Sequence, residues 1–120
     1  MAVMTFQLQD GLKIGESVYY DVGLRELDTE DLIDAQRESE KVIVHDGKPM
    51  AYTSDVTYGI EMLRRQVEYI GKVQGPFSLK ELLKLSARDF TLVQQKAQDL
   101  DAMILQELEA RGRSQGASGA

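Results

Sequence analysis

Two helix starts stand almost back to back in residues 75–90, and they constrain the fold more than any other feature of the chain. Ser78 is followed three residues later by Glu81, which is the spacing of a capping box, and Ser86 is followed by Asp89 at the same spacing. Apolar pairs flank both starts as in a hydrophobic staple: Phe77 with Leu82, and Leu85 with Phe90. The sequence therefore predicts a helical elbow, a short helix over 79–85 that is followed at once by a longer one.

The longer helix is predicted to run from about Ala87 to Ala110 and to be amphipathic. Its apolar stripe consists of Phe90, Val93, Ala97, Leu100, Ile104 and Leu108. At 1.5 Å per residue this helix is roughly 36 Å long, whereas a domain of this size has a radius of gyration near ~13 Å. Its distal apolar residues are thus expected to form an interface, and the alternative is that they pack back onto the domain core.

The N-terminal part of the chain has the alternation of strands. Apolar and polar residues alternate over 6–8, 12–14 and 18–24, and Asp10-Gly11 is typical of a hairpin turn. These patterns predict a small antiparallel hairpin or meander, which needs a helix on its apolar face.

The central part is predicted to be mainly helical. Asp28 is a suitable N-cap for a helix over 29–39, and Ser54 opens a second helix that ends around residues 71–75. The stripe of the second helix consists of Val56, Ile60, Leu63, Val67 and Ile70. Residues 42–53 between these helices are either a second hairpin or a mobile loop, and the loop is favoured. The predicted fold class is α+β, a small N-terminal antiparallel hairpin or meander followed by a predominantly helical body of about four helices.

Composition bounds the domain organisation. A chain of 120 residues corresponds to one domain, assigned to residues 1–110, and the Gly-, Ser- and Ala-rich residues 111–120 are predicted to be a disordered tail. Apolar runs are too short to span a bilayer, and the N-terminus does not resemble a signal peptide, so a cytoplasmic location and no membrane partner are expected.

The net charge of −6 is concentrated in residues 25–41, which contain seven acidic and three basic residues. Such a surface repels phosphate backbones, so nucleic acid is not an expected ligand. The segment is either a solvated helix face or a patch that meets a basic partner.

No constellation of residues indicates catalysis or a cofactor. The chain has no cysteine, and its one histidine, His45, lies beside Asp46 in a segment rich in glycine and proline without further ligands. Asp28, Asp31 and Asp34 lack the glycine and the terminal glutamate of a calcium loop. The sequence therefore predicts a protein that is not an enzyme and that binds no metal or cofactor.

The order of several short motifs resembles the tail assembly chaperones of Mu-like contractile-tailed phages and prophages. The motifs are residues 22–27, residues 31–35, Glu61 to Gln66 with Tyr69-Ile70, Gly75 to Leu79 with Leu82, and Leu85 to Phe90. The resemblance, over about residues 6–105, implies a non-catalytic phage protein of the host bacterial cytoplasm. Such a protein keeps the tape measure protein soluble during tail assembly and is absent from the finished virion. It also implies that related phages append a second domain to some copies by a ribosomal frameshift.

A partner that covers the apolar stripes of a long helical chain must itself present apolar grooves or helices. The candidate partner-binding residues are Tyr58, Met62 and Tyr69 on the second helix, with Leu100, Ile104 and Leu108 on the last. The alternative function is a small cytoplasmic adaptor or regulatory protein that dimerises through its C-terminal helix, and a homo-oligomer is compatible with either function.

Overall fold

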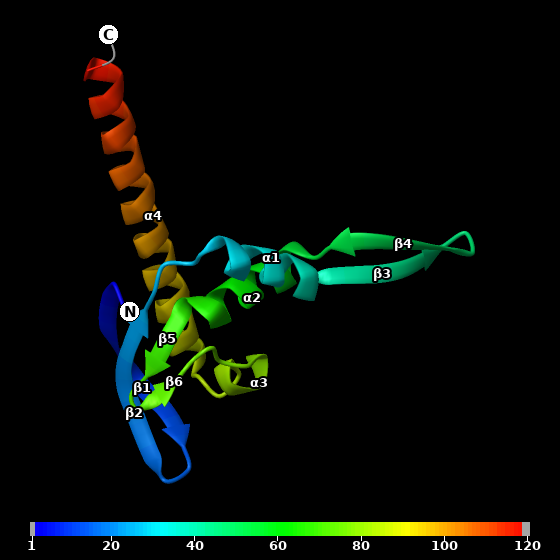
Figure 1. The fold of residues 1–120 in the computed structure, drawn as a ribbon. Helices are drawn as coiled ribbons and strands as arrows, with labels where there is room; N and C mark the ends of the chain where they lie inside the picture. Colours follow the sequence, from blue (N-terminus) through cyan, green and yellow to red (C-terminus); the bar gives the residue numbers. More distant parts are fainter. Residues whose placement is uncertain (1, 119–120) are drawn as a thin grey trace.

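The computed structural model describes residues 2–118 and has an α+β fold (Figure 1). Its elements are β1 (Met4–Ile14), β2 (Ser17–Leu24), α1 (Thr29–Glu38), β3 (Glu40–His45), β4 (Lys48–Thr53), α2 (Asp55–Gln66), β5 (Val67–Ile70), β6 (Val73–Gln74), α3 (Leu79–Leu82) and α4 (Ala87–Ser118). A four-stranded antiparallel sheet has the order β1-β2-β5-β6, and β3 pairs with β4 in a separate hairpin.

The hairpin turn predicted at Asp10-Gly11 is wrong. β1 continues through both residues, and the chain turns at Gly15-Glu16 instead. Gly11 has a φ of 84°, and the register between β1 and β2 shifts between Gln7 and Leu12, so the Asp-Gly pair forms a bulge inside a long strand. The Asp-Gly pair thus marks a β-bulge here and not a hairpin turn.

The predicted second helix is too long. α2 ends at Gln66, and the next four residues form β5, which pairs with β2. Val67 and Ile70, assigned to the stripe of a helix, are buried in this strand instead. Their β-branched side chains fit both patterns, and the free edge of β2 decides between them.

The preference for a mobile loop at residues 42–53 is also wrong, because this segment forms the β3–β4 hairpin. Its two turn residues, Asp46 and Gly47, have φ values of 52° and 75°. Positive φ at both positions is the geometry of a type I′ turn, for which Asp-Gly is a favoured pair.

The helix starts are largely as predicted. At Ser78 the capping box is complete: the Glu81 N–H donates to Ser78 Oγ at 3.2 Å, and the Ser78 N–H donates to Glu81 Oε1 at 3.1 Å. Asp28 caps α1. Ser86 caps α4 by accepting the Asp89 N–H at 3.2 Å, but the Asp89 side chain binds elsewhere and does not complete the second box.

α4 extends beyond the end predicted near Ala110. Its helical backbone continues to Ser118, and Arg111 donates to Glu107 at 2.7 Å across one turn. Eight residues of the predicted tail are therefore helical, and 119–120 lie outside the described residues. The division into a domain over 1–110 and a tail over 111–120 stays a prediction.

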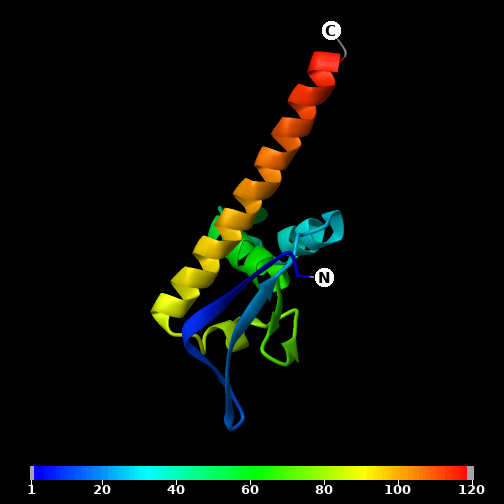
Figure 2. The same ribbon diagram turned by 90° about the vertical axis from the view of Figure 1, so that its left-hand side faces the viewer.

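The core lies between the sheet and the helices, and α4 packs against β1. Its largest fully buried apolar side chains are Phe77, Leu12, Leu24, Ile70, Val22, Val67 and Val93. The radius of gyration is 17.8 Å, whereas a compact chain of this length has about 14 Å. The difference arises because the distal half of α4 and the β3–β4 hairpin project from the body in different directions (Figure 1), and Figure 2 shows the projection of α4 from a second side.

Candidate partner-binding surfaces

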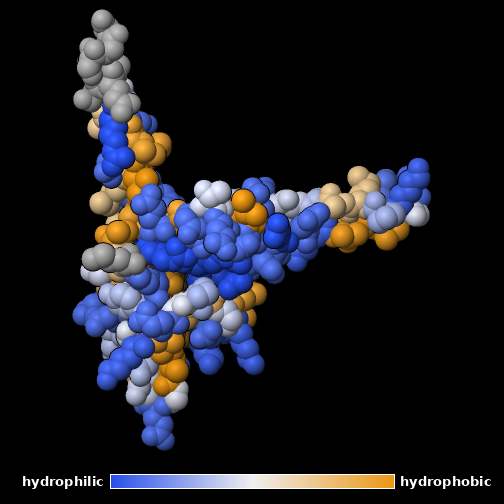
Figure 3. All heavy atoms as spheres, in the orientation of Figure 1, coloured by the Kyte–Doolittle hydropathy of each residue, from blue (hydrophilic) through white to orange (hydrophobic). Residues whose placement is uncertain are grey.

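The distal half of α4 is the first candidate surface. We call residues 101–112 the α4 arm. Along the helix, Val93, Ala97 and Leu100 are buried, Ile104 packs partly against the core, and Leu108 is 54% exposed. Met103 and Leu105 on the arm are exposed as well, at 55% and 57%. The arm therefore presents large aliphatic side chains that the body does not cover, visible as orange atoms in Figure 3.

The predicted residues of this helix do not form one uncovered surface. Leu100 is only 3% exposed and belongs to the core. Ile104, near the start of the arm, packs partly against the core, and of the three residues only Leu108 is exposed. One part of the apolar stripe of α4 thus belongs to the core, and the other part lies on the surface.

A groove of about 560 Å³ between α2 and α4 is the second candidate surface. Its apolar lining consists of Leu27, Val56, Gly59, Ile60, Met62, Leu63, Phe90 and Ala97, and its polar lining of Asp55, Gln66, Gln94, Gln98 and Asp101. Ala97 precedes Leu105 by 8 residues and Leu108 by 11. Asp101 precedes the same two leucines by 4 and 7 residues. Residues at such spacings share one face of a helix, so the groove leads onto the α4 arm.

The predicted residues of the second helix are separated by the structure. Met62 lines the groove, whereas Tyr58 is half-buried on α2 outside the groove lining. Tyr69 lies in β5 and belongs to a pocket on the sheet. The three residues therefore do not form a single surface.

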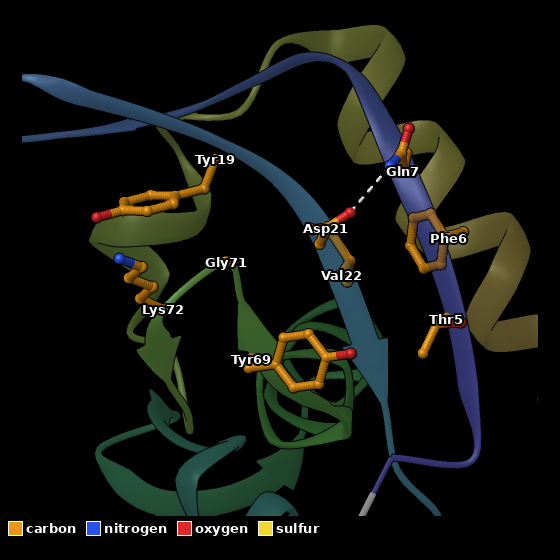
Figure 4. Close-up of a pocket in the computed structure, with 9 residues that line it drawn as sticks. All are labelled: Thr5, Phe6, Gln7, Tyr19, Asp21, Val22, Tyr69, Gly71 and Lys72. Atoms are coloured by element: carbon orange, nitrogen blue, oxygen red, sulfur yellow. Dashed lines mark hydrogen bonds between the residues drawn. The ribbon is translucent and has the colours of Figure 1, made fainter.

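The sheet pocket is shown in Figure 4 and also has a volume of about 560 Å³. Two aromatic rings lie over glycines here: a Cβ atom at Gly23 would overlap the ring of Tyr69, and one at Gly71 would overlap that of Tyr19. Gln7 Nε2 donates to Asp21 Oδ1 at 3.0 Å along one wall. The two tyrosine rings thus pack on glycine backbone, and a larger residue at either glycine would overlap the ring that covers it.

The basic pair on α2 is structural. Glu61 accepts from Arg64 Nε at 2.9 Å and from Arg65 Nη1 at 2.8 Å, and Arg64 also donates to the Phe77 carbonyl at 3.2 Å. Burial alone raises the pKa of Glu61, but the hydrogen bonds from Arg65 and Arg64 outweigh burial and hold the pKa below its usual value. Arg64 therefore holds α2 to the elbow, whereas Arg65 pairs within α2.

Sequence reasoning missed a carboxylate clip between α4 and β1. Asp89 is fully buried and accepts the backbone N–H groups of Gln9, Asp10 and Gly11 at 2.8, 2.9 and 3.1 Å. In return, Asp10 accepts from Arg88 Nε at 2.7 Å and from Ser86 Oγ at 2.5 Å. Nothing local to either segment signals this pairing, because it joins residues that are 78 to 80 positions apart in the chain.

His45 and Asp46 lie 3.4 Å apart at the exposed tip of the β3–β4 hairpin. In the described part of the chain, no group of three or more His, Asp and Glu side chains is placed to hold a metal ion. Within residues 2–118, no helix combines the length and the apolarity needed to cross a membrane.

Comparison with known proteins identifies the family. The family described as "Tail assembly protein gp41" matches residues 8–113. Mu-like prophage FluMu protein gp41 of Haemophilus influenzae is 33% identical over 111 residues, which are 92% of this chain and 87% of that protein. The probable tail assembly protein gp41 of Escherichia phage Mu is 38% identical over 112 residues, which are 89% of this chain and 78% of that protein.

A longer relative covers the same region. The probable tail assembly protein FS-gp41 of Escherichia phage Mu is 42% identical over 88 residues, which are 70% of this chain and 47% of that protein. The matched region thus spans about half of its length. No solved structure matches the chain. The family match covers most of the sequence, so the chain belongs to the gp41 tail assembly family of Mu-like phages and prophages.

Proposed function

We propose that this chain is a non-catalytic tail assembly chaperone that binds the tape measure protein and keeps it soluble during tail morphogenesis. It acts in the host bacterial cytoplasm and is absent from the mature virion. Membership of the tail assembly family supports a role in this process, and the exposed apolar surfaces support a role in binding.

One observation carries the proposal: a single face of α4 lines the groove and then continues onto the exposed arm. The groove supplies Phe90 and Ala97, and the arm supplies Leu105 and Leu108. From residue 97 to 112 this face is roughly 24 Å long at 1.5 Å per residue. An amphipathic helix of the partner fits such a surface by laying its apolar side along it.

Leu108→Asp tests this surface, because a charge there opposes burial of the arm in a complex. Burying a leucine contributes about 1.5–3 kcal/mol, so the affinity for the tape measure protein should fall about 10- to 150-fold. Leu108 is exposed, so the melting temperature should stay close to that of the wild type. The measurement is co-expression with the tape measure protein of the same genome, followed by a solubility assay and pull-down.

Gln106→Asp is the matched control. It adds the same charge to an exposed position on the opposite side of the arm, so it should retain binding. Equal loss in both variants, or full binding by Leu108→Asp, would contradict the proposal. If Leu108→Asp instead dissociates a dimer of this chain and the tape measure protein is not captured at all, the adaptor alternative is correct.

A further inference from the structure

The β3–β4 hairpin, residues 40–53, exposes all its residues to solvent, those of the turn included, and no other strand pairs with it in the described chain. Val42, Ile43 and Val44 in β3 are 69%, 47% and 73% exposed. Figure 3 shows apolar atoms along this hairpin, far from the body. A two-stranded hairpin with such a surface is marginally stable alone, which indicates that it has a partner.

The hydrogen-bond pattern shows which backbone groups point outward. The Ser54 N–H donates to the Ser39 carbonyl at 3.0 Å, at the base of the hairpin. Bonded and non-bonded pairs alternate in an antiparallel ladder, so Lys41–Tyr52 and Ile43–Met50 are bonded pairs. The residues between them therefore direct their N–H and C=O groups away from the hairpin: Glu40, Val42 and Val44 on β3, and Pro49, Ala51 and Thr53 on β4.

The two outer edges differ in their capacity to pair. Pro49 has no N–H to donate, so the β4 edge is blunted in the way that natural sheet edges usually are. The centre of β3 contains no proline and no charge, and its pairing with β4 is regular throughout. The β3 edge is thus an open template for an added strand.

We propose that β3 binds β3 of a second copy of this chain, antiparallel about a two-fold axis at Val42. The product is a continuous four-stranded sheet in which Val42 faces Val42 of the second copy and Glu40 faces its Val44. An isologous contact of this kind requires a self-complementary segment, and the uncharged centre of β3 supplies one.

Charge and shape favour a second copy as the occupant. Glu40 and Asp46 balance Lys41 and Lys48, so the hairpin is neutral in a chain of net charge −6. Two copies therefore approach there without the repulsion that the acidic α1 would cause. Because the hairpin projects from the body, antiparallel pairing places the two bodies at opposite ends of the new sheet (Figure 1). This surface is separate from the α4 arm, so the proposal goes beyond the chaperone function and does not depend on it.

Disulfide trapping tests the pairing, because the chain has no cysteine of its own. In the proposed dimer the two Cα atoms of residue 42 form a bonded pair roughly 5.5 Å apart, within the range that a disulfide spans. Oxidised Val42→Cys protein should thus run as a linked dimer on a non-reducing gel. Ala51→Cys is the matched control, because residue 51 lies cross-strand from Val42 on the blunted edge. It should not be cross-linked and should run as a monomer on the same gel.

A proline pair tests the same edge without cross-linking. Val42→Pro removes an outward N–H and leaves the bonds to β4 intact, so light scattering of the full chain should change from dimer to monomer while the melting temperature is retained. Ala51→Pro makes the same change on the other edge and should remain a dimer. A wild type that is monomeric, equal cross-linking at positions 42 and 51, or a dimer that survives Val42→Pro would overturn the proposal.

The other occupants give distinct results. If the wild type is monomeric and Val42→Pro loses the tape measure protein, the edge binds that protein and not a second copy. If Leu108→Asp and not Val42→Pro dissociates the dimer, the copies meet through α4. Loss of tape measure binding by Leu108→Asp with an intact dimer would leave both proposals standing.

Discussion

At the scale of single residues, Asp89 connects the first turn of α4 to β1. Its carboxylate is fully buried and accepts three backbone N–H groups from the β1 bulge. The carboxylate also lies in the first turn of α4, where the helix dipole favours negative charge. Both interactions hold the carboxylate at the junction of sheet and helix.

Asp89→Asn should therefore destabilise the fold. An amide has one acceptor oxygen and adds an NH₂ donor, so some of the bulge N–H groups lose their partner. We expect the free energy of unfolding to fall by at least about 2 kcal/mol, because each unsatisfied buried donor costs about 1–3 kcal/mol. Urea denaturation measures this change.

Glu109→Gln removes the same charge from an exposed position on α4 and is the control. Its unfolding free energy should stay within about 0.5 kcal/mol of the wild type. Equal stability of Asp89→Asn and wild type would show that the clip contributes nothing.

Asp10 should make stability depend on pH in the acid range. Hydrogen bonds from Arg88 and then Ser86 lower the pKa of Asp10 from 3.8 to about 2. The folded-state pKa lies below the unfolded value, so the ionised side chain stabilises the fold fully above about pH 4, and this contribution is lost as the pH falls to about 2. The stability difference between wild type and Asp10→Asn should shrink over this window in denaturant melts.

Asp31, paired with Arg25 at 2.7 Å, has a pKa of about 2 as well, but it is present in both proteins and its contribution cancels. A difference that stays constant from pH 6 to pH 2 would rule out the contribution of Asp10.

At the scale of elements, the elbow makes a prediction about caps and staples. Ser78→Ala removes a cap hydrogen bond and should cost about 1 kcal/mol, and Phe77→Ala should cost about 3–5 kcal/mol because its ring is completely buried. Leu83→Ala is the control, since Leu83 in the same segment is 73% exposed. If denaturant melts show the same cost for Phe77→Ala and Leu83→Ala, the elbow is not part of the core.

The elements that the sequence predicted correctly are those fixed by neighbours in the chain. The caps at Asp28 and Ser78 depend on residues three positions away, and so they could be predicted. Val67 and Ile70 form a strand because β2 offers an edge, and the Asp10-Gly11 bulge exists because Asp89 binds it. These outcomes depend on tertiary contacts that no local pattern contains.

The candidate surfaces follow the same division. The helical stripe of α4 was visible in the sequence, but the point where it leaves the core, between Leu100 and Leu108, is set by the size of the body. The β3–β4 hairpin is predictable from the sequence, because Asp46-Gly47 is the same favoured turn pair as Asp10-Gly11.

At the scale of the whole molecule, the extended shape is measurable. Small-angle X-ray scattering from the monomer should give a radius of gyration close to 17.8 Å, because both the α4 arm and the hairpin project from the body. The monomeric Val42→Pro protein is a suitable sample. A value near 14 Å, that of a compact chain of this length, would mean that the projections fold back.

The position of Asp89 has a mechanical consequence. α4 is a rod held over residues 87–100, and beyond them Asp101 accepts from Gln66 Nε2 at 3.2 Å and Ile104 packs partly against the core, while Leu105 and Leu108 are exposed. A sideways force on the distal turns is therefore multiplied by leverage as it reaches the held end. There the load falls on the contacts of Asp89 and Arg88 with β1, so a sideways force on the distal turns of α4 is transmitted to the first strand.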